Sequence, residues 1–97
     1  MAQELDKEFF NRAGPYINLA NSQCNGVSGD QVRTSFTYAA ARFASWVFAT
    51  NFDSGYEMQA AKQERMDYLV AEFRAMLEAH MNDHIDNFAK LMTPPKE

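Results

Sequence analysis

Apolar residues recur at helical spacing near the start of the chain. A single helix face, in steps of three or four residues, comprises Leu5, Phe9, Ala13, Tyr16, Ala20 and Cys24. This face passes through Gly14 and Pro15, a pair that kinks or breaks a helix. We therefore predict either one kinked helix or two short collinear helices over residues 3–24.

Two capping patterns mark the beginnings of two further helices. Ser28 is followed three residues later by Gln31, and Ser54 by Glu57, which is the spacing of a capping box. The first pattern predicts a helix over residues 29–51. The second predicts a helix over residues 55–92, because neither Gly nor Pro occurs between Tyr56 and Thr93. Residues 93–97 are expected to form a frayed tail.

These elements predict an all-α fold and a single domain over residues 1–97. Three helices joined by short loops favour a three-helix antiparallel bundle with a long third helix. That helix would be about 55 Å long, whereas a compact domain of this chain length is only about 30 Å across. The third helix therefore overhangs the bundle.

The overhanging part of the third helix carries its own apolar stripe. If the second and third helices form a hairpin, the second helix reaches no further than Leu77. Beyond that point four apolar residues share one face: Met81, Ile85, Phe88 and Met92.

Two arrangements would cover this stripe. In the first arrangement, the helix breaks near Asn82-Asp83-His84, and residues 84–92 fold back over the stripe. Alternatively, a second copy covers the stripe in a homodimer with two-fold symmetry. The homodimeric helical bundle is the favoured alternative.

Composition and charge weigh against several classes of protein. The net charge is -4, and the basic residues are dispersed among acids, which argues against nucleic-acid binding and against anionic membrane surfaces. The most apolar segment, SFTYAAARFASWVFATNF, is too short to span a membrane and has Arg42 at its centre. A lone cysteine, Cys24, and a charged amino terminus predict a cytoplasmic protein.

Arg42 is the one charged residue of that apolar segment. The hairpin register places it near Glu64 and Asp67, which predicts a structural ion pair, because a buried guanidinium without a partner is costly. The alternative is a crevice near Arg42 and Trp46 that binds a small ligand.

His80 and His84 are four residues apart and share one helix face, a spacing that chelates transition metals. Two ligands do not make a complete site, so interfacial histidines are the favoured interpretation of this pair. Neither a phosphate-binding loop nor a recognisable catalytic set occurs in the sequence. We therefore expect no enzymatic activity and no cofactor.

Two stretches, FFNRAGPYINLAN and YAAARF, resemble a family of small bacterial, mostly proteobacterial, proteins catalogued as a domain of unknown function. The resemblance covers about residues 8–88. It implies a bacterial cytoplasmic source and brings no known activity, cofactor or functional residue.

Taken together, the sequence predicts a non-enzymatic module for protein–protein interaction or oligomerisation, whose partner is a second copy or another protein. The alternative is a helical bundle that binds a metal through His80 and His84, or a small ligand near Arg42.

Overall fold

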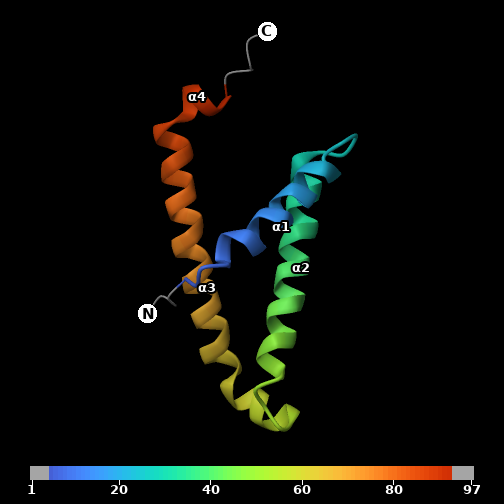
Figure 1. Ribbon diagram of the computed structural model, residues 1–97. Helices are drawn as coiled ribbons and strands as arrows, with labels where there is room; N and C mark the ends of the chain where they lie inside the picture. Colours follow the sequence, from blue (N-terminus) through green and yellow to red (C-terminus); the bar gives the residue numbers. More distant parts are fainter. Residues whose placement is uncertain (1–4, 93–97) are drawn as a thin grey trace. The chain divides into compact units, whose positions relative to one another are not determined.

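The structure describes residues 5–92, and this part of the chain consists of helices joined by short turns. In this computed structural model, the side chains are described as far as residue 90. The helices are α1 (Phe9–Gln23), α2 (Gly29–Ala49), α3 (Gly55–Asp86) and the short α4 (Phe88–Met92), shown in Figure 1. No strand occurs between residues 5 and 92, which confirms the predicted all-α fold. The expected frayed tail, residues 93–97, lies outside the described residues.

The chain divides into two units. Met1–Gly55 contains α1 and α2, and Tyr56–Glu97 contains α4 and nearly all of α3. An antiparallel bundle of all three long helices would join these two units, and it stays a prediction.

The helix α1 begins at Phe9 rather than at residue 3. The carboxylate of Asp6 accepts the backbone N–H of Glu8 at 2.9 Å, and the carbonyl oxygen of Asp6 accepts the N–H of Phe9 at 3.1 Å. These bonds form a local turn that competes with a helix for the same backbone groups. The chain therefore enters α1 from a turn.

The same aspartate pairs with a side chain on the first turns of α1. A guanidinium nitrogen of Arg12 donates to Oδ2 of Asp6 at 2.8 Å. This hydrogen bond lowers the pKa of Asp6 and raises the pKa of Arg12. Both side chains are exposed, so water and salt weaken the pair. Its main effect is to hold the turn against α1.

Pro15 lies inside a continuous α1. The helix extends without a break from Phe9 to Gln23, so the alternative of two short collinear helices was wrong. A proline has no N–H, and the carbonyl of Asn11, four residues earlier, therefore lacks the usual helical hydrogen bond from residue 15.

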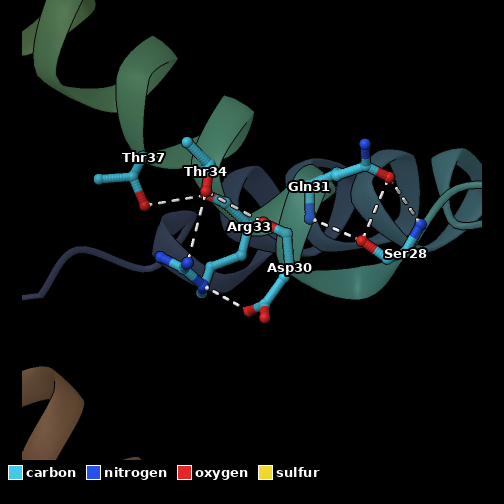
Figure 2. A network of polar contacts seen from close by, with 6 residues as sticks. All are labelled: Ser28, Asp30, Gln31, Arg33, Thr34 and Thr37. Carbon is cyan, nitrogen blue, oxygen red and sulfur yellow. Dashed lines mark hydrogen bonds and ion pairs between the residues drawn. The ribbon is translucent and has the colours of Figure 1, made fainter.

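The turn between α1 and α2 ends in the predicted capping box. Gly26 adopts a φ of 81°, a left-handed conformation that glycine reaches without strain. Ser28 Oγ then accepts the N–H of Gln31 at 3.1 Å, while Gln31 Oε1 accepts the N–H of Ser28 at 3.2 Å (Figure 2). Both backbone donors at this helix end are thereby satisfied, and α2 begins at Gly29 as predicted.

Further polar contacts continue along the first turns of α2, as Figure 2 shows. Arg33 pairs with Asp30 at 3.2 Å, and the hydroxyl of Thr34 donates to the carbonyl of Asp30 at 3.0 Å. The hydroxyl of Thr37 donates to the carbonyl of Arg33 at 2.9 Å. All of these partners lie within four residues of each other, so the network supports the helix locally and assembles no site from distant segments.

Substituting Ser28 by alanine is expected to destabilise the protein by about 1 kcal/mol, because the N–H of Gln31 loses its acceptor. Thermal unfolding followed by circular dichroism measures this as a drop in Tm of about 4–8 °C for a domain of this size. Ser45→Ala is the matched control, since the hydroxyl of Ser45 donates only to the carbonyl of Arg42 in the middle of α2. Equal melting of the two variants would contradict a capping role.

The first unit has a small core. The helices α1 and α2 meet next to the turn that joins them and diverge away from it (Figure 1). Val32, one turn into α2, is 7% exposed and is the buried hydrophobic residue of the described chain. Phe36, Phe43 and Val47, also on α2, are exposed.

Candidate interaction surface on α3

The helix α3 extends from Gly55, directly after Ser54, to Asp86. The helix α3 was predicted to extend to residue 92, and it ends six residues earlier. The alternative, a break near Asn82-Asp83-His84, was wrong, because the helix continues through these residues to Asp86. At Asn87 the side-chain amide donates to the carbonyl and to the carboxylate of Asp83, each at 3.0 Å. The last turn of α3 is thus closed by a side chain of the residue that follows it.

The short α4 does not fold back along α3. The chain changes direction after Asp86, and α4 lies at the end of α3 rather than beside it (Figure 1). Met81, Ile85 and Phe88 are 54%, 63% and 62% exposed, so α4 leaves the predicted stripe open within this unit. The side chain of Met92, the fourth predicted stripe residue, lies outside the described side chains.

The apolar stripe of α3 is longer than predicted. Steps of three or four residues connect six large apolar side chains, each between 48% and 63% exposed: Met66, Val70, Phe73, Leu77, Met81 and Ile85. Such steps place side chains on one face of a helix. We call these six residues the α3 stripe; its first residue and its last are separated by about 28 Å along the helix.

Sequence reasoning missed the first four residues of the α3 stripe. Only the residues beyond Leu77 were considered as an uncovered stripe, and Met66, Val70 and Phe73 were not singled out. Their spacing of three or four residues, which continues into Met81 and Ile85, is the signal that connects them to the predicted part.

His80 and His84 both lie on α3, within the length of the stripe, and both are exposed. Among the described residues, no group of three or more His, Cys, Asp or Glu side chains is arranged to hold a metal ion. Asp83, which lies between the two in sequence, has its carboxylate engaged by Asn87. The histidines therefore supply two ligands from this chain, and the predicted metal site stays a prediction.

Arg42 lies on the first unit and is exposed on α2. Its predicted partners, Glu64 and Asp67, lie on α3 in the second unit, so the ion pair stays a prediction. On α2 itself the neighbourhood of Arg42 is aromatic: the rings of Phe43 and Trp46 are 6.0 Å apart with their planes tilted by 33°. The predicted small-ligand crevice near Arg42 and Trp46 stays a prediction.

Cys24 stands at the end of α1 as an exposed free thiol. Its sulfur donates to the carbonyl of Ala20 at 3.5 Å, a weak hydrogen bond within the helix end. None of the described helices is both long enough and apolar enough to cross a bilayer.

The fold and the exposed α3 stripe define a small all-α protein with an apolar helix face open to contact. The chain belongs to a family described as protein of unknown function, DUF3144, whose model matches residues 9–85. This confirms the predicted membership of a family of unknown function.

A solved structure supports the same fold. The chain is similar to protein NB7890A from Shewanella sp., whose structure was determined by NMR, with 36% sequence identity and a TM-score of 0.76. The similarity covers 97% of this chain and 100% of that one. A comparison with curated proteins gave no match. The comparisons thus establish the family and the helical fold, and they name no activity.

Proposed function

We propose that this protein is a non-enzymatic module that acts by binding other protein chains, a second copy included, through the α3 stripe. The observation that carries the proposal is the row of six half-exposed large apolar side chains along one face of α3. A contiguous exposed apolar surface of this kind marks interaction sites in soluble proteins. The helix α4 leaves it open.

Charge and residue types support a protein as the partner. The net charge of -4 disfavours phosphate backbones and anionic lipids. The stripe itself consists of Met, Val, Phe, Leu and Ile, side chains whose transfer from water to an apolar contact is favourable. We also propose a bacterial, cytoplasmic setting, supported by the lone cysteine and by the Shewanella relative.

Sedimentation equilibrium from about 1 to 100 µM tests the proposal, across the range in which weak to moderate self-association is visible. The expected result is a mass that rises with concentration from the 11.1 kDa of one chain towards twice that value. The melting temperature should rise with concentration in parallel, because association stabilises the bound form by mass action. A mass of one chain at every concentration would contradict self-association.

Metal binding is the second candidate function, favoured by the shared helix and four-residue spacing of His80 and His84. Elemental analysis of untagged protein tests it directly, with His80→Ala as the comparison. Stoichiometric zinc, nickel or copper that is lost in the variant would support a metal site. Absence of metal from both proteins would reject it.

A further inference from the structure

We propose that the α3 stripe is occupied by the α3 helix of a second copy, antiparallel to the first, about a two-fold axis level with Ala75 and Met76. This inference rests on the proposed function and names its partner and geometry. In this arrangement Arg74 of each copy faces Glu78 of the other.

The spacing of the stripe is nearly symmetric about its own middle. A two-fold axis level with the midpoint between residues 75 and 76 pairs residues of the two copies. Each residue lies opposite the residue of the other copy that is equally far from this midpoint in the sequence, on its other side. Met66 then lies opposite Ile85 and Val70 opposite Met81, while Phe73 and Leu77 differ in level by one residue, about 1.5 Å along the helix. A self-complementary interface requires this property, because both copies present the same surface.

The charged border of the stripe has the same symmetry. Arg74 and Glu78 are one turn apart, and both border Leu77 on the same side of α3. Both are exposed, and neither has an ion-pair partner among the described residues of α3 and α4. In an antiparallel two-fold pair, the side of the stripe that carries Arg74 and Glu78 faces the same side of the stripe in the other copy. The same axis places Arg74 within one residue, about 1.5 Å, of the level of Glu78 of the other copy, twice.

The orientation also suits the helix dipoles. Two parallel helices of this length would place like partial charges side by side at both ends, whereas antiparallel helices place opposite ones there. Charge complementarity and apolar register thus favour the same arrangement.

The area of the stripe is sufficient for a stable dimer. Six large apolar side chains that each expose about half to two-thirds of their surface present on the order of 100 Å² each, hence about 600 Å² per copy. Two copies together would bury about 1,200 Å², the lower end of the range for specific, stable interfaces. A second copy therefore supplies enough contact by itself.

Charge reversal at the border tests the arrangement. The variants are Arg74→Glu, Glu78→Arg and the double variant that carries both changes. Each single reversal sets like charges against each other at two symmetric positions, so the Kd for self-association measured by sedimentation should rise about tenfold or more. The double variant restores opposite charges, and its Kd should return to within about threefold of the original.

The control is Asp86→Arg, which makes the same charge change as Glu78→Arg but on the opposite side of α3. The Kd of this control should equal that of the original protein. Failure of the double variant to recover would overturn the proposed pairing. A monomeric original protein would overturn self-association itself, whereas failure of the double variant alone overturns only the pairing, so the two failures are distinguishable.

Disulfide trapping tests the direction of the helices. In a Cys24→Ser background, a mixture of Met66→Cys and Ile85→Cys chains is oxidised and the products are separated by mass spectrometry. An antiparallel pair favours the mixed disulfide, because these positions lie opposite each other. A predominance of disulfides between identical chains would overturn the antiparallel arrangement while leaving self-association through the stripe in place.

Discussion

Replacing Leu77 by aspartate is expected to abolish the proposed self-association and to leave a monomer of one 11.1 kDa chain. Leu77 lies in the middle of the α3 stripe, so a two-fold interface would bury the new carboxylate of both copies. Burial of an unpaired charge costs several kcal/mol, which corresponds to an increase in Kd of about 100-fold or more. Size-exclusion chromatography with light scattering measures the mass, and circular dichroism checks that the helix content is kept.

Ala75→Asp is the matched control for this substitution. Ala75 is an exposed residue two positions away that lies on the opposite side of α3, so it introduces the same charge outside the stripe. The control should associate like the original protein. An equal loss of association in both variants would point to damage of the helix, and no loss in Leu77→Asp would remove the stripe as the interface.

Replacing Pro15 by alanine is expected to stabilise the protein by about 1–3 kcal/mol. Pro15 lies inside α1, where it supplies no N–H to the carbonyl of Asn11, and proline is the least favourable residue of a helix interior. Urea unfolding followed by circular dichroism measures the free energy of unfolding as an increase in the midpoint concentration at unchanged slope.

Two glycines provide the comparisons for Pro15→Ala. A Cβ at Gly14 would have no atom within 4 Å, so Gly14→Ala should stabilise α1 by about 0.5–1 kcal/mol. Gly26 has a φ of 81°, and Gly26→Ala should destabilise the turn instead. A neutral or destabilising Pro15→Ala would show that the proline contributes a specific contact that the helix needs.

The beginnings of α2 and α3 were predictable, because capping patterns involve residues that are close together in the sequence. Ser28 and Gln31 form the expected capping box, and α2 begins where their spacing placed it. The helix ends were harder to predict. Asn82 and Asp83 are weak helix formers that suggested a break, but the helix continues to Asp86, where Asn87 closes it by bonding to Asp83. At the other end of the chain, Asp6 delays α1 through a turn that the apolar pattern did not reveal.

The outcome at Pro15 shows the limit of a local rule. Gly14 and Pro15 indicated either a kink or a break, and the sequence alone did not decide between them. The structure shows one helix, because the loss of a single hydrogen bond leaves the bonds of the neighbouring turns in place.

By itself, the sequence determined the all-α class, the family resemblance and the approximate positions of the long helices, since hydrophobic periodicity and capping act over a few residues. Only the tertiary structure decided how α4 lies against the helix before it. Periodicity gives Met81 and Ile85 the same pattern whether residues 88–92 fold back over them or not. Within this unit α4 leaves both side chains exposed.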